Sequence, residues 1–120
     1  MKSRSSTAAR VAALVAPALL FASGAQAHAH LEKANPAENA AVAAPKVIHL
    51  EFSEKLEPKF SGVELMKADG TAVAVTSKAA GKTIDGALAA PLAPGGYMVM
   101  WHVISADGHK MKGQYNFTVK

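Results

Sequence analysis

Two segments far apart in the chain carry residues that could bind a metal ion. His28 and His30 directly follow the small-residue sequence AQA. Near the C-terminus, Asp107-Gly108-His109 places a carboxylate and an imidazole two positions apart. In an extended segment, residues i and i+2 point the same way, and glycine lets the backbone bend between them. Asp107 and His109 are therefore predicted to reach a common point.

The first residues have the pattern of a secretory signal peptide. Residues 1–10 carry three basic side chains and no acid, and residues 11–23 are apolar or small. The sequence ending at Ala27 fits the small-x-small rule for signal peptidase. The apolar run is shorter than the roughly 20 residues that a membrane-spanning helix needs. We therefore expect residues 1–27 to be removed and residues 28–120 to form one domain that begins with His28.

Composition and charge exclude several classes of function. The 120-residue chain has no cysteine, which excludes disulfides, thiolate zinc sites and a cysteine nucleophile. Cleavage after Ala27 would leave 10 basic and 9 acidic residues, so most of the formal net charge of +4 belongs to the signal segment. No basic stripe remains for nucleic acid. We therefore expect no nucleic-acid partner, and we expect that the mature chain, once the apolar signal segment is removed, is not embedded in a membrane.

Alternating apolar and polar residues predict short β-strands. The alternation is clearest in residues 47–52, 97–103 and 110–119, where every second side chain is apolar. Asp69-Gly70 and Asp85-Gly86 are typical turn sequences, because glycine accepts positive φ at little cost. Short strands with a turn signal about every ten residues are typical of an all-β sandwich. We therefore predict an all-β fold.

The candidate donors suit Cu(II). At a cleaved N-terminus, His28 offers its α-amine and its imidazole side by side. Together with Asp107 and His109, these donors make a set of one amine, two imidazoles and one carboxylate. Such nitrogen and oxygen ligands suit tetragonal Cu(II), whereas Zn(II) prefers a tetrahedron. The amine binds only when it is deprotonated, so affinity should fall as the pH drops.

Two other arrangements compete with this set. The amine, two backbone amides and the imidazole of His30 can wrap Cu(II) in a square plane without Asp107 or His109. Alternatively, Asp107 and His109 belong to a solvated turn without a metal ion. The sequence patterns leave these alternatives open.

A second row of soft donors lies on one predicted strand. Met98, Met100 and His102 share the face opposite to Tyr97 and Val99. If that face is exposed, the row could bind Cu(I), because thioethers prefer soft ions. Packing is the simpler interpretation, since methionine fills irregular gaps.

The mature chain resembles the bacterial CopC-type (CopC/YobA-like) periplasmic copper-binding proteins over its whole length. The segments that carry this resemblance are AHAHLEKANPAENA, IHLEFSEKLEPKFSGVEL and LAPGGYMVMWHVISADGHKMKGQYNFTV. The resemblance implies an immunoglobulin-like Greek-key β-sandwich in the periplasm, with Cu(II) held by His28, Asp107 and His109. It also implies a protein that buffers or delivers copper, often beside a CopD-type transporter of the inner membrane, and it does not imply catalysis. We expect the protein to be a monomer.

One feature departs from part of that family. Some members carry a methionine-rich loop for Cu(I), but the corresponding region here, residues 66–82, has one methionine, Met66. We therefore expect a single Cu(II) site and no Cu(I) site of the family type.

Two functions of other classes remain as alternatives. A copper-dependent oxidase or monooxygenase could use His28 and a second histidine as a histidine brace. Asp107 argues against this, because an anionic ligand stabilises Cu(II) and discourages redox cycling. A structural or adhesive module with an incidental N-terminal histidine would bind copper only weakly.

Overall fold

The computed structural model describes residues 29–120. The predicted signal peptide, residues 1–27, and the predicted ligand His28 lie outside the described residues. Within residues 29–120, no helix is long and apolar enough to cross a membrane.

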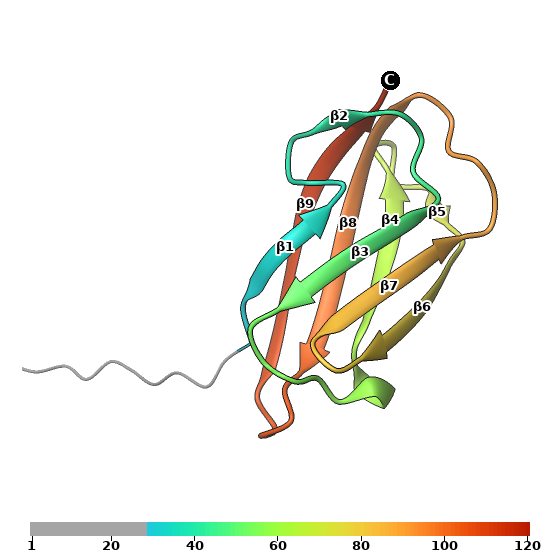
Figure 1. The fold of residues 1–120 in the computed structure, drawn as a ribbon. Helices are drawn as coiled ribbons and strands as arrows, with labels where there is room; N and C mark the ends of the chain where they lie inside the picture. The colour runs from blue at the N-terminus through green and yellow to red at the C-terminus, as the bar shows by residue number, and fades with distance from the viewer. Residues whose placement is uncertain (1–28) are drawn as a thin grey trace, which may run out of the picture.

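The described chain forms a sandwich of two β-sheets, which confirms the predicted fold (Figure 1). The four-stranded sheet has the order β1-β3-β7-β6 and the five-stranded sheet the order β2-β9-β8-β4-β5. The elements, in chain order, are β1 (Leu31–Asn35), β2 (Ala41–Val42), β3 (Val47–Phe52), the 3-10 helix η1 (Pro58–Phe60), β4 (Gly62–Lys67), β5 (Ala72–Val73), β6 (Val75–Ala80), β7 (Thr83–Leu88), β8 (Gly95–Ile104) and β9 (Lys110–Val119).

The core lies between the sheets and follows the predicted alternation. In β3 every second residue is fully buried, and the same holds for the second half of β9. The buried side chains that face each other across the sandwich include Ile48, Leu50, Phe52 and Ile84 of the smaller sheet and Leu65, Val99, Val103, Tyr115 and Phe117 of the larger one. Because side chains alternate between the faces of a strand, the intervening residues point outward.

One predicted turn is wrong. Asp85 and Gly86 lie inside β7, where they pair with His49 and Ile48 of β3. The β6–β7 turn is instead at Gly81, whose φ is +60°. Gly86 is needed for close packing: an added Cβ would stand 2.7 Å from a methyl carbon of Val63 in the opposite sheet. The sequence pattern does not separate a turn glycine from one that lets two sheets approach.

The other predicted turn is confirmed. β4 and β5 form an antiparallel hairpin, and Gly70 at its tip has a φ of +91°. The backbone N–H of Thr71 donates a hydrogen bond to Oδ1 of Asp69 at 2.9 Å. This side-chain bond to a backbone two residues on is the reason aspartate is common in turns.

Candidate metal centre

Asp107 and His109 lie in the loop that joins β8 to β9, and the structure brings their side chains together. Nδ1 of His109 is 3.0 Å from Oδ1 of Asp107, and both side chains are about half exposed. Gly108 between them has a φ of +94°, in the region that favours glycine. The predicted convergence of this carboxylate and this imidazole is confirmed.

Hydrogen bonds from Ser105 stabilise the β8–β9 loop. It is almost fully buried, and its hydroxyl donates a hydrogen bond to Oδ1 of Asp107. Its backbone N–H donates to the carbonyl of His109 at 2.9 Å, and its carbonyl accepts from Gly108 at 2.8 Å. Ser105 was not predicted from the sequence. The signal for it was the spacing Ser-x-Asp, because serine side chains often bond groups two residues on.

These hydrogen bonds keep Asp107 charged. The bond from the Ser105 hydroxyl, followed by the bond from His109, lowers the pKa of Asp107 from 3.8 to about 2. Hydrogen bonds to the ionised form favour that form. The site therefore presents a carboxylate anion to any cation throughout the neutral pH range.

Removing the Ser105 hydroxyl should raise the pKa of Asp107 toward its ordinary value. In the metal-free protein, Ser105→Ala is expected to raise the pKa of Asp107 from about 2 toward 3.8, because the largest cause of its lowering is lost. The carboxyl carbon shift of Asp107, followed by NMR against pH, measures this. Ser61→Ala is the matched control, since the Ser61 hydroxyl is also buried but accepts from the N–H of Ile104. An unchanged pKa in Ser105→Ala would show that this bond is unimportant.

Ala29 and His30 are held at the end of the sandwich that carries the β8–β9 loop. Ala29 is fully buried in the core. The backbone N–H of His30 donates to Oγ of Ser53 at 2.8 Å, and the N–H of Ser53 donates to the carbonyl of His30 at 2.9 Å. Burial and these two hydrogen bonds therefore hold Ala29 and His30 in place.

One short segment, residues 53–56, contacts both His30 and the β8–β9 loop. Ser53 bonds His30, and the carbonyl of Lys55 accepts from the N–H of Ala106 at 2.8 Å. Ser53 and Lys55 are two residues apart and therefore at most about 7 Å from each other. His30 and the β8–β9 loop are thus attached at neighbouring points. Figure 1 shows the start of β1 and the β8–β9 loop at the same end of the sandwich.

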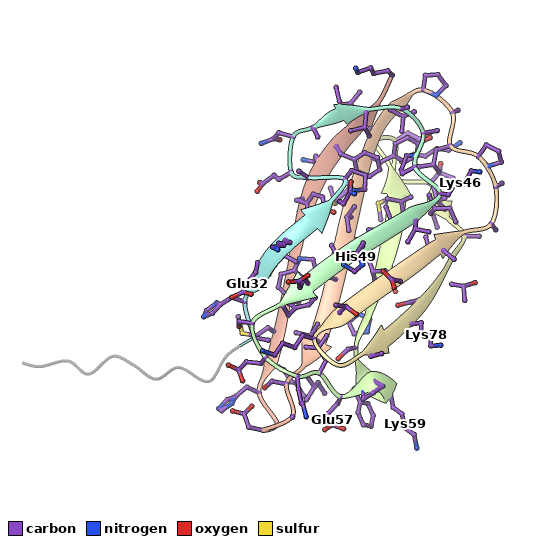
Figure 2. All side chains as sticks on the ribbon, in the orientation of Figure 1. Glu32, Lys46, His49, Glu57, Lys59 and Lys78 are labelled. Atoms are coloured by element: carbon purple, nitrogen blue, oxygen red, sulfur yellow. The ribbon has the colours of Figure 1, made fainter. Side chains whose placement is uncertain are left out.

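The remaining histidines lie elsewhere. His49 is on β3, facing outward from the smaller sheet (Figure 2), and its Nδ1 is 2.5 Å from Oδ1 of Asp85 on β7. His102 is exposed on β8. Within residues 29–120, no three side chains among His, Asp and Glu gather closely enough to hold a metal ion. Asp107 and His109 are thus the two described members of the predicted set.

A family model described as "CopC domain" matches residues 31–120. The chain belongs to the CopC family. The matched range includes Asp107 and His109 and begins three residues after His28. This confirms the family that the three sequence segments suggested.

Other members of the CopC family are similar over most of their length. Protein YobA of Escherichia coli K12 is 46% identical over 99 residues, which cover 78% of this chain and 80% of that protein. Copper resistance protein C of Xanthomonas campestris pv. juglandis is 39% identical over 128 residues, covering 99% and 97%. The crystal structure of PcoC, a methionine-rich copper resistance protein from Escherichia coli, superposes with a TM-score of 0.73 at 39% identity, covering 78% of this chain and all of PcoC.

Proposed function

We propose that this CopC-family chain, cleaved after Ala27, is a periplasmic protein that binds one Cu(II) ion and buffers or delivers it. The ligands are the α-amine and imidazole of His28, the carboxylate of Asp107 and the imidazole of His109. The protein acts as a monomeric carrier and performs no catalysis. A CopD-type transporter of the inner membrane is the partner that the family resemblance suggests.

The observation that carries this proposal is that residues 53–56 hold both His30 and Ala106, which lie close in sequence to the proposed ligands His28 and Asp107. Ser53 holds His30, two residues after His28, while Lys55 holds Ala106, the residue before Asp107. We infer from this common attachment that a ligand set drawn from segments almost 80 residues apart is preorganised for copper. Such preorganisation lowers the entropy lost on binding.

The donor chemistry supports copper in its divalent state. Nitrogen donors and one carboxylate suit a tetragonal Cu(II) ion, which also leads the affinity order of the divalent metals. Asp107, with its pKa lowered to about 2 by the hydrogen bonds from Ser105 and His109, supplies a carboxylate that is ionised at neutral pH. An anionic ligand favours Cu(II) over Cu(I), which supports a carrier more than an oxygen-activating enzyme.

The competing mode at His30 would disrupt contacts that the fold makes. Wrapping Cu(II) requires the backbone nitrogens of Ala29 and His30 as ligands. The His30 nitrogen already donates to Ser53, and Ala29 is buried in the core. That mode would therefore cost a hydrogen bond and pull Ala29 from the core, so we assign His30 a place beside the site.

Single substitutions at the loop test the proposal. Asp107→Ala and His109→Ala are each expected to weaken Cu(II) binding by at least about 100-fold, more than the 10–100-fold typical for residues behind the ligands. A titration of the mature protein against a competing chelator measures this, and EPR reports the donor atoms.

His49→Ala is the matched control, because His49 pairs with Asp85 on the outer face of the other sheet. Its Cu(II) affinity should equal that of the unchanged protein. Equal affinities for all three variants would contradict the assigned ligands. Sustained, ascorbate-driven oxygen consumption by the copper-loaded protein would contradict a carrier without catalysis.

A further inference from the structure

Three of the four methionines in residues 29–120 lie on one face of the larger sheet. Met66 is on β4, and Met98 and Met100 are on β8. All four are half-buried, and the fourth, Met111 on β9, packs against the core. Methionine on the outward face of a sheet is unusual, since its apolar side chain belongs inside.

The surroundings show that this face is the outer one. The inward residues that alternate with the methionines on β4 and β8, Leu65 and Val99, are buried. Polar neighbours border the methionines on the same face: Glu64 and Gln114 pair with Met100, and Asn116 pairs with Met98. These three polar residues are exposed. Core packing therefore does not account for the methionine cluster.

The strand register brings the three thioethers within reach of one ion. Met66 stands directly opposite Met98, where paired Cβ atoms are about 4.5–5.5 Å apart. Met100 is two positions along β8 on the same face, about 7 Å from Met98, and it is a diagonal neighbour of Met66 at about 7–8 Å. A methionine side chain has three rotatable bonds, so three sulfur atoms at these spacings can converge on one point.

We propose that Met66, Met98 and Met100 form a binding site for Cu(I) on the outer face of the five-stranded sheet. Three soft thioether donors select a soft monovalent ion, and the hard divalent ions that prefer oxygen do not compete for them. The site goes beyond the proposed Cu(II) function and shares no ligand with it. Met100 lies four positions, about 14 Å at 3.4 Å per residue, before Ile104, where β8 ends and the loop that carries Asp107 begins. The two sites are therefore distinct.

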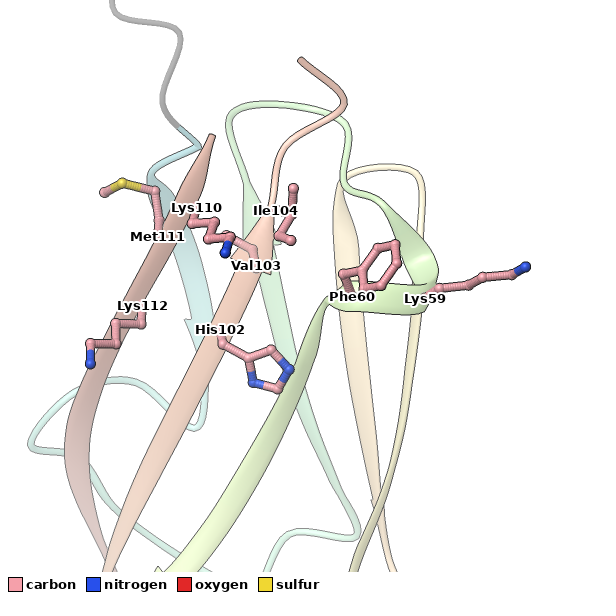
Figure 3. A pocket seen from close by; sticks show the side chains of 8 residues that line it. All are labelled: Lys59, Phe60, His102, Val103, Ile104, Lys110, Met111 and Lys112. Atoms are coloured by element: carbon pink, nitrogen blue, oxygen red, sulfur yellow. The ribbon is translucent and has the colours of Figure 1, made fainter. Parts of the chain in front are cut away.

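This site differs from the row of soft donors that the sequence alternation places on one face of β8, Met98, Met100 and His102. His102 pairs with Gly62, four positions along both strands from the pair of Met66 and Met98. At about 3.4 Å per residue, that separation is roughly 14 Å. The His102 ring also leans from β8 toward β4 beside Gly62 (Figure 3). Met66 takes the place that the sequence pattern gave to His102.

An anaerobic Cu(I) titration tests the site. The mature protein, kept reduced, competes with bicinchoninate for Cu(I), and it is compared with the triple variant Met66→Leu/Met98→Leu/Met100→Leu. Leucine keeps the volume and removes the sulfur. We expect the triple variant to lose one Cu(I) per chain, with at least about 100-fold weaker binding. Met111→Leu, the matched control, should bind as the unchanged protein does.

A second readout locates the ion directly. In protein with 13C-labelled methionine methyl groups, Ag(I), a redox-inert soft ion, should shift the resonances of Met66, Met98 and Met100 and leave that of Met111 in place. Equal Cu(I) binding by the triple leucine variant, or shifts confined to Met111, would overturn the proposal. A third result would also overturn the proposal: the metal-free protein self-associates, Met98→Glu abolishes this association, and that variant binds Cu(I) as the unchanged protein does. The methionine face would then be a docking surface.

The Cu(II) proposal and the Cu(I) proposal can be tested independently of each other. His109→Ala should keep the Cu(I) bound by the methionines, and the triple leucine variant should keep the Cu(II) EPR signal. Loss of Cu(II) binding in the triple leucine variant would contradict the independence of the two sites. Absence of Cu(II) binding in all forms would overturn the proposed carrier function and leave the Cu(I) result standing.

Discussion

A mature chain extended by one glycine ahead of His28 is expected to bind Cu(II) at least about 100-fold more weakly than the chain that begins with His28. The extension turns the α-amine into an amide, so the chelating pair of amine and imidazole is lost. The comparison is a chelator-competition titration of the two purified forms. The unextended form should also lose affinity as the pH falls below about 8, because protons compete for its amine.

A glycine added after Lys120 is the control for this experiment, since it changes the length and leaves the amine of His28 in place. Its affinity should equal that of the unextended chain. If the N-terminally extended form bound equally well, the amine would not be a ligand, and copper would have to depend on other donors.

Phe52→Ala is expected to lower the free energy of unfolding by about 3–5 kcal/mol. Phe52 is fully buried on β3, and its ring meets the ring of Trp101 on β8 edge to face, with centroids 5.1 Å apart. Its loss leaves a cavity between the two sheets next to the strand end that positions residues 53–56. Because small domains are stable by only about 5–15 kcal/mol, this is a large fraction of the total. Urea unfolding followed by circular dichroism measures the change.

Phe60→Ala is the matched control for that measurement. Phe60 is on η1 and is 58% exposed, so its removal should change stability by less than about 0.5 kcal/mol. A Phe52→Ala variant as stable as Phe60→Ala would show that the contact between Phe52 and Trp101 contributes little to the association of the sheets.

Strand identity was predictable wherever one face of a strand is buried. Ile48, Leu50 and Phe52 alternate with polar residues, and all three are fully buried. Alternation alone does not predict the burial of Trp101, which shares a face with Val99 but is only half-buried, with its ring against Gly113 of β9. Alternation reports which face a side chain is on and does not report how far the sheet covers it.

Only the part of the candidate site that lies within one short segment, Asp107 and His109, was predictable from the sequence. Asp107 and His109 are two residues apart, so backbone geometry alone suggests that they converge. Ser105 was missed because its hydrogen bond depends on the turn that the loop adopts. The position of His28 lies outside the described residues, and its role as a ligand stays a prediction.

By itself, the sequence determined the kinds of donor atoms, the spacing of Asp107 and His109, and the alternation that makes β-strands. These properties depend on neighbours along the chain. Only the tertiary structure decided that residues 53–56 hold both His30 and Ala106, and that Met66 stands opposite Met98. The reason is that strand register and loop docking arise from contacts between segments distant in sequence, and a pattern within one segment carries no information about its partner.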